Sequence, residues 1–141
     1  MRIIGLDLGN RTVGVALSDY LGIIANPVGT FRFEEQDLDS ALEQVVAVIK
    51  ENQVEKIVLG LPKNMNGSIG DSGNRVIEFS ELIKESLNIK VELWDERLTT
   101  VAAHKAMIEA DLSRQKRKKI VDKIAAIYIL QGYLDRLSNK K

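Results

Sequence analysis

The sequence contains no cysteine, one histidine and two prolines, and only 5% of its residues are aromatic. The absence of cysteine excludes disulfide scaffolds, thiolate zinc sites, iron–sulfur clusters and cysteine nucleophiles. Because His104 is the only histidine, a Ser-His-Asp triad would have to use it, and sites with several histidine ligands are excluded. No apolar run is long enough to span a membrane, and the opening run MRIIGLDLG is broken by Asp7 and lacks the length of a signal peptide. We therefore expect no membrane partner and a cytoplasmic location.

The length of the chain indicates one domain, and the distribution of its charges indicates a polarised surface. A chain of 141 residues, 45% of them hydrophobic, can bury roughly two-thirds of its unfolded surface, and we interpret residues 1–141 as a single domain. The net charge is zero, but residues 1–103 carry 10 basic and 16 acidic side chains, whereas residues 104–141 carry 10 and 4. The basic excess is greatest at residues 114–119 (RQKRKK), which indicates either a surface for a polyanion or a solvated helix start.

The hydrophobic pattern predicts a mixed α/β fold. Three apolar runs with turns between them suit antiparallel strands over residues 2–8, 12–18 and 23–33. Further strands are predicted over residues 55–61 and 91–94, and helices over 37–52, after the loop 63–73, at about 100–110 and over 118–137. This order predicts a five-stranded mixed sheet, three antiparallel strands followed by parallel ones, with helices on both faces. Ligands of such sheets bind beyond the carboxyl ends of the parallel strands.

Carboxylates occur where these strand ends are predicted. Asp7 interrupts an apolar strand, and it serves either to cap the following turn or to bind a ligand. Asp95 and Glu96 end the strand VELW, either as an ordinary turn with an ion pair or as part of a site. Asp122 lies near the start of the last predicted helix, where it either favours the helix N-terminus or faces the strand ends.

Three acids gathered at one sheet edge would require a cation, because like charges a few ångströms apart raise each other's pKa values. Oxygen ligands suit Mg²⁺ or Mn²⁺, and one or two such ions would activate a water and stabilise the leaving oxygen of a phosphodiester. The basic residues 114–119 would then hold a nucleic-acid backbone.

Four motifs, IIGLDLGNRTVGVALSD, GLPKNMNG, WDERLTT and VDKIAAIYILQGYLD, together resemble the YqgF (RuvX) family over nearly the whole chain. The resemblance implies a ribonuclease H-like fold and a relationship to the Holliday-junction resolvase RuvC. It also implies a nuclease, first proposed to cut recombination junctions and later implicated in maturing the 5′ end of pre-16S ribosomal RNA. The family's first-strand aspartate matches Asp7, its second acidic position Glu96 with Asp95, and its final-helix aspartate Asp122.

One feature departs from the wider superfamily, in which many nucleases carry the second carboxylate at the end of the fourth strand. Here that place is Gly60-Leu61-Pro62, so the cluster must use Asp95 or Glu96, and we favour Glu96 for its longer reach. Neighbouring residues on an extended segment face opposite ways, so only one of the two needs to point inward. The residues expected to contact nucleic acid are Asn10, Arg11, Lys63, Arg97, Arg114, Lys116, Arg117, Lys118 and Lys119.

Several alternatives stay open at this point. The substrate is structured RNA or branched DNA, and a nucleic-acid-binding module without catalysis is the alternative from another class. A homodimer would suit a symmetric junction, whereas a monomer would suit trimming of one RNA strand.

Overall fold

The computed structural model describes residues 2–96 and 114–139, and in the second range it describes the side chains of residues 125–138. Its elements are β1 (Arg2–Leu8), β2 (Thr12–Ser18), β3 (Ala25–Arg32), α1 (Leu38–Glu51), β4 (Val54–Leu61), α2 (Asp71–Ser86), β5 (Lys90–Asp95) and α4 (Arg114–Asn139). The predicted helix at about 100–110, together with Arg97 and His104, lies outside the described residues. Among the described helices, none combines the length and apolar character needed to cross a bilayer.

The five strands form one mixed sheet in the order β3-β2-β1-β4-β5. β2 pairs antiparallel with both β1 and β3, whereas β1, β4 and β5 are parallel to each other. The predicted mixed sheet is therefore confirmed. The carboxyl ends of the three parallel strands lie at the same edge, where Asp7, Leu61 and Asp95 are found.

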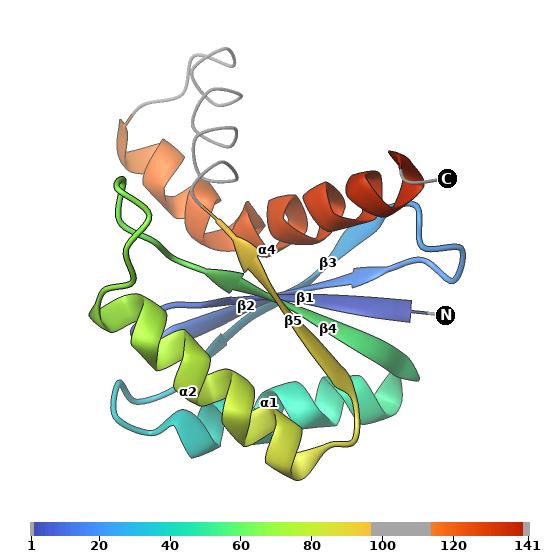
Figure 1. Cartoon of the computed structure of the whole chain (residues 1–141), viewed down its shortest axis with the longest axis horizontal. Coiled ribbons are helices and arrows are strands. Elements are labelled where there is room, and N and C mark those ends of the chain that lie inside the picture. Colours follow the sequence, from blue (N-terminus) through green and yellow to red (C-terminus); the bar gives the residue numbers. More distant parts are fainter. Residues whose placement is uncertain (1, 97–113, 140–141) are drawn as a thin grey trace.

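Helices cover both faces of the sheet, α1 and α2 on one and α4 on the other (Figure 1). Side chains alternate along β1, so that Ile4 and Leu6 pack in the core beneath α1 and α2 while Ile3 packs in the core beneath α4. By the same alternation Gly5 and Asp7 belong to the α4 face. The face on which the site is built is therefore the one that α4 crosses.

Two strand glycines let α4 approach the sheet closely. A Cβ atom placed on Gly5 would lie 2.6 Å from Cβ of Leu130, and one on Gly60 would lie 2.5 Å from Cδ1 of Ile129. Carbon atoms in ordinary contact are about 3.5–4.0 Å apart, so a larger residue at Gly5 would require movement of the helix, and one at Gly60 would require the ends of the Ile129 and Glu96 side chains to move.

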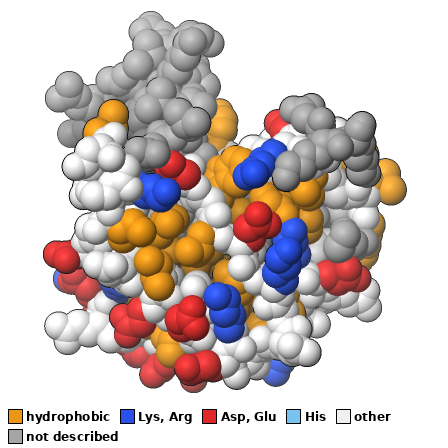
Figure 2. Space-filling model, in the orientation of Figure 1, with side chains coloured by type: hydrophobic (Ala, Val, Ile, Leu, Met, Phe, Trp, Pro, Cys, Tyr) orange, Lys and Arg blue, Asp and Glu red, His pale blue; other side chains and the backbone are white. Residues whose placement is uncertain are grey.

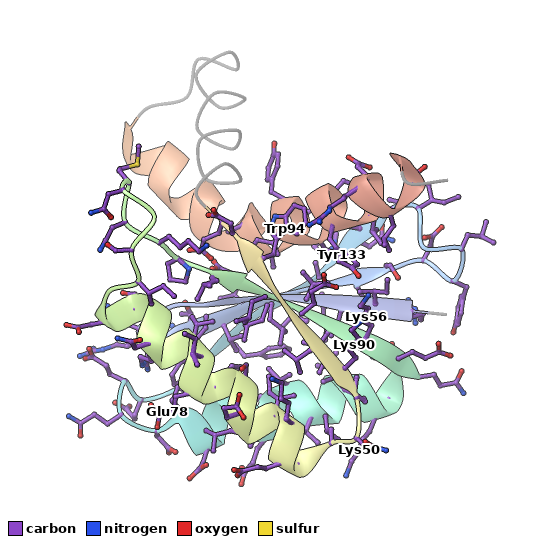
Figure 3. All side chains as sticks on the ribbon, viewed as in Figure 1. Lys50, Lys56, Glu78, Lys90, Trp94 and Tyr133 are labelled. Carbon is purple, nitrogen blue, oxygen red and sulfur yellow. The ribbon has the colours of Figure 1, made fainter. Side chains whose placement is uncertain are left out.

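A polar network joins α4 to β4 and β5 beyond this contact. Lys56 lies 3.2 Å from the carboxylate of Glu92 and donates a hydrogen bond to the hydroxyl of Tyr133. The Tyr133 ring meets Trp94 edge-on, with 5.9 Å between centroids, and the Arg136 guanidinium lies 5.6 Å from the Trp94 ring (Figure 3). These contacts hold β5, one of the two edge strands of the described sheet, against the helix.

The starts of β3 and α4 differ from the sequence prediction for local reasons. β3 begins at Ala25 rather than at residue 23, because the Asp19 carboxylate accepts hydrogen bonds from the backbone N–H groups of Ile23 and Ile24 and draws them into a turn. α4 begins at Arg114 rather than at residue 118. The intervening arginine, glutamine and lysine residues are good helix formers and include no glycine or proline that would stop the helix.

Candidate active site

Asp7 is the second-to-last residue of β1 and pairs with Gly14 of β2. Its side chain is half-buried. Strand alternation directs it to the face that α4 covers, in line with Gly5 and Ile3. Because β1 is paired on both sides, with β2 and β4, the backbone that carries this carboxylate is rigid. The predicted acid at the first strand end therefore lies at the carboxyl edge of the sheet.

Glu96 follows β5 directly, and its N–H continues the ladder by donating to the carbonyl oxygen of Leu61 at 3.2 Å. Its Oε2 atom lies only 2.5 Å from the point that a Cβ of Gly60 would occupy. Glu96 therefore extends across β4, the strand between it and β1. Neighbouring strands are about 4.8 Å apart, so only a long side chain passing over a glycine can reach from β5 to β1.

The two carboxyl groups of Asp7 and Glu96 interact directly. The pKa of Glu96 is raised from 4.5 to about 8, chiefly by burial and then, in decreasing order, by the negative charge of Asp7, a hydrogen bond with Asp7 and the charge of Asp95. A protonated Glu96 can donate its hydrogen to the Asp7 carboxylate, so the pair shares a proton near neutral pH. A cation placed between the two groups would stabilise the form in which both are ionised.

A pocket of about 250 Å³ opens over this pair. It is lined by Asp7, Leu8, Gly9, Asn10, Pro62, Ser72, Arg75 and Glu96. These residues come from β1 and its turn, the end of β4, the start of α2 and the end of β5. The pocket thus lies beyond the carboxyl ends of the parallel strands, where ligands of such sheets bind.

The donor chemistry of the pair fits a hard divalent cation. Carboxylate oxygens are the ligands that Mg²⁺ and Mn²⁺ prefer, and a cation would offset both the burial and the repulsion from Asp7 that raise the pKa of Glu96. Within the described part of the chain, no group of three or more acidic or histidine side chains is close enough to hold a metal. Asp122 lies in α4, but its side chain is outside the described residues. Its backbone is four residues, about one helical turn, before Ala126, whose carbonyl oxygen lies 3.1 Å from the Cβ position of Gly5.

Of the predicted nucleic-acid contacts, three are described. Asn10 is exposed at the rim of the pocket, Arg11 is exposed with its guanidinium 3.9 Å from the Glu35 carboxylate, and Lys63 is half-buried just after β4. The basic residues 114–119 form the first turns of α4, with their side chains outside the described residues, as is Arg97.

The loop between β4 and α2 is organised by its own hydrogen bonds. The N–H of Asn64 donates to the carbonyl of Ser68 at 2.9 Å, and the Asn66 side chain accepts from the N–H of Ser68 at 3.0 Å. These hydrogen bonds give the loop a defined shape.

A larger cleft of about 720 Å³ lies on the other side of Arg75, between α2 and the segment that leads into α1. Its acidic lining residues are Glu35, Asp39, Asp71 and Glu78. Figure 2 shows acidic side chains gathered along the α1 and α2 side of this view. This surface would repel a polyanion, so a nucleic acid is expected on the α4 side of the pocket.

Sequence reasoning missed two residues of the site. Gly60 had been noted only for the acid it lacks, and its role in making room for Glu96 depends on which strands are neighbours. Arg75 drew no attention because its sequence context is that of an ordinary amphipathic helix, and no local signal distinguishes it from exposed arginines.

Comparison with known proteins points to the same family as the four sequence motifs. Residues 1–136 match the model of a family described as RuvX, Holliday junction resolvase. The chain belongs to the RuvX family. This match confirms the resemblance drawn from the four motifs.

Relatives within the family are close. A protein from Clostridium botulinum (strain Alaska E43 / Type E3), named "Putative pre-16S rRNA nuclease", is 62% identical over 138 residues, which cover 98% of this chain and 99% of that protein. A protein of the same name from Clostridium kluyveri is 59% identical over the same length, with the same coverage.

Solved structures show the same fold at low sequence identity. RuvC of Thermus thermophilus in complex with a Holliday junction substrate has a TM-score of 0.59 and 12% identity, covering 97% of this RuvX-family chain and 96% of its own. The Fowlpox virus resolvase in complex with Holliday junction DNA has a TM-score of 0.55 and 13% identity, covering 97% and 99%. The ribonuclease H-like fold implied by the motifs is therefore confirmed.

Proposed function

We propose that this RuvX-family protein is a divalent-metal-dependent nuclease that hydrolyses phosphodiester bonds in processing the 5′ end of pre-16S rRNA. The observation that carries the proposal is the Asp7–Glu96 pair, in which a half-buried carboxylate and a Glu96 with its pKa raised to about 8 meet beside an open pocket. Carboxylates brought together at such energetic cost indicate a site that functions with a cation bound.

In this proposal Asp7, Glu96 and Asp122 hold Mg²⁺ or Mn²⁺, one or two ions, with Asp95 as a further oxygen donor. When bound, the ion activates a water molecule and stabilises charge on the phosphate and leaving oxygens. Glu96 would release its proton to water when it binds the cation, and the strands paired on both sides of β1 would hold the Asp7 carboxylate in place.

The substrate backbone is held by the cationic and polar residues around the pocket. Asn10 and Arg11 on the β1–β2 turn and Lys63 after β4 lie at the same sheet edge as the acids. Arg97, Arg114, Lys116, Arg117, Lys118 and Lys119 complete the set by their place in the sequence. Phosphate contacts of this kind supply affinity that falls with salt concentration.

Pre-16S rRNA is the favoured substrate because the relatives at 59–62% identity carry the name of a pre-16S rRNA nuclease. With this substrate, we propose that the protein acts as a monomer in the cytoplasm. A Holliday junction is the second candidate, favoured by the family description and by the RuvC and Fowlpox resolvase folds. In that case a homodimer would present two sites to the symmetric junction. A binding module without catalysis would have no need to retain the acidic pair.

The test compares cleavage of an RNA carrying the pre-16S 5′ end with cleavage of a four-way DNA junction, each with Mg²⁺ or Mn²⁺. Asp7→Asn, Glu96→Gln and Asp122→Asn should each reduce cleavage by about 100-fold or more while the protein stays folded, because each removes a ligand for the ion. Glu55→Gln is the matched control, since it removes an exposed carboxylate at the amino end of β4, the end of the strand opposite the acidic pair.

The two substrates distinguish the two candidate functions. Cleavage of the junction but not of the RNA would replace the favoured substrate by the second. Binding of RNA without cleavage in any metal would show a binding module instead. Cleavage that persists in all three acid variants would contradict the proposed site.

A further inference from the structure

Arg75, in the second turn of α2, bonds three backbone carbonyl groups from two distant segments. Its Nη1 donates to the carbonyl oxygen of Gly9 at 2.7 Å, and its Nη2 donates to those of Asn10, at 3.1 Å, and Glu35. The guanidinium also lies 5.6 Å from the centre of the buried Phe33 ring. The residue is half-buried and lines the pocket of the acidic pair.

These bonds join the β1–β2 turn to α2 and to the segment before α1. Within the turn, the N–H of Gly9 donates to the carbonyl of Thr12 at 2.7 Å, and the carbonyl of Arg11 accepts from the N–H of Phe33 at 3.0 Å. The carbonyls of Gly9 and Asn10 point instead toward Arg75. Bonds between a charged donor and a backbone carbonyl are stronger than neutral ones, so Arg75 contributes strongly to fixing the turn.

The position of Asp7 does not depend on the hydrogen bonds of Arg75, whereas that of the β1–β2 turn does. Its strand is paired on both sides, and its register partner on β2 is Gly14. The turn that follows, with Asn10 and Arg11 exposed on it, extends beyond the sheet ladder. Loss of Arg75 should therefore loosen the turn and leave the acidic pair in place.

We propose that Arg75 is a positioning residue, which holds the β1–β2 turn so that Asn10 and Arg11 meet the substrate backbone beside the acidic pair. This inference rests on the proposed function, since it assigns these two residues to a nucleic acid. It predicts that Arg75 affects substrate binding and not the affinity for the metal ion.

Arg75→Gln and Arg75→Lys test the proposal in the full chain. Lysine keeps the charge, but its ammonium group is a compact point charge that cannot bond three carbonyls as a planar guanidinium does. Lys84→Gln is the matched control, because Lys84 is an exposed cation on the same helix, 3.4 Å from Glu81. Binding is measured by fluorescence anisotropy of the pre-16S 5′ RNA with Ca²⁺ in place of Mg²⁺, and Mn²⁺ binding by calorimetry.

Both Arg75 variants should weaken RNA binding by about tenfold, while Lys84→Gln changes it less than twofold and Mn²⁺ affinity stays within about twofold in all three. In an Arg11→Gln background, Arg75→Gln should have a smaller effect, because one of the two residues that Arg75 positions is already replaced. Full RNA binding by Arg75→Lys would show that only the charge matters and would overturn the proposal. A large loss of Mn²⁺ affinity in a folded variant would also overturn it.

Amide hydrogen exchange separates this proposal from the proposed function. In both Arg75 variants, exchange of the N–H of Gly9 and of Phe33 should accelerate by about tenfold, because the turn opens more often. Unchanged exchange would show that Arg75 does not hold the turn. If the wild-type protein does not bind the RNA, the proposed function fails, and the exchange measurement still decides whether Arg75 positions the turn.

Discussion

We expect the metal-free protein to lose stability as the pH rises from acid to alkaline values. The Glu96→Gln variant should lose much less. Glu96 is held beside Asp7 in a site that raises its pKa from 4.5 to about 8, chiefly through burial and then through the charge of Asp7. Gln has nearly the same shape but does not ionise. The variant therefore isolates the contribution of this one proton.

The direction follows from proton linkage. Unfolded Glu96 loses its proton near pH 4.5, whereas folded Glu96 keeps it to about pH 8. Between these values the folded state binds more protons, so the free energy of unfolding falls as the pH rises through this window. At about 1.4 kcal/mol for each tenfold change in acid dissociation, the upper bound is roughly 5 kcal/mol. Sharing of the proton with Asp7 and partial contact with water should reduce this to about 2–3 kcal/mol, a large part of the stability of a small domain.

Trp94, the only tryptophan, provides the assay. It lies on β5 against Tyr133 of α4, so its fluorescence reports separation of the edge strand from the helix. Urea unfolding with EDTA, at pH 5 and at pH 8.5, gives the free energy of unfolding of wild type and Glu96→Gln. All other titrating groups are common to both proteins, so the difference between them belongs to Glu96 and its partners.

The wild type should lose about 2–3 kcal/mol more than Glu96→Gln between the two pH values, and excess Mg²⁺ or Mn²⁺ should restore much of this loss in the wild type alone. Equal pH dependence of the two proteins would refute the reasoning, since Glu96 would then ionise as it does in the unfolded chain.

Three further predictions follow from the same structure. Gly60→Ala should destabilise the protein by about 1–3 kcal/mol in urea unfolding and greatly reduce cleavage, because the new methyl group collides with Glu96 and Ile129. Normal stability and activity would show that Glu96 does not cross β4. Lys56→Met should lower the unfolding free energy at pH 7 by about 1–2 kcal/mol, since the hydrogen bond to Tyr133 and an ion pair are lost; an unchanged urea midpoint would contradict this. EDTA should abolish RNA cleavage and Mn²⁺ should restore it, whereas cleavage in EDTA would exclude the metal.

Much of the fold could be predicted because burial imposes a simple period on the sequence. The continuous apolar run of β1 follows from burial of both its faces, and the spacing of apolar residues in α1 and α4 follows from the helix face that packs in the core. The boundaries were less accurate where a side chain competes with the backbone. Asp19 is the clearest case, since its carboxylate takes two N–H groups that would otherwise extend β3.

The site could be predicted only in part. Asp7 is recognisable because a carboxylate is out of place in an apolar strand, and Glu96 because the strand end and side-chain length favour it. The space over Gly60 and the three bonds of Arg75 depend on residues brought together from distant parts of the chain. Neither leaves a periodic or compositional trace, so no reading of local sequence could have found them.

The absence of a side chain at Gly60 also limits how the proposed catalytic arrangement can evolve. The second carboxylate of such a site can belong to β4 itself or to the end of β5, but the two side chains would occupy the same volume above residue 60. If the acid moves from one strand to the other by single substitutions, the intermediate protein has either two side chains that collide or no second acid. Lineages that adopt the longer route, with the acid at residue 96, should therefore keep glycine at residue 60, and the two positions should change together or not at all.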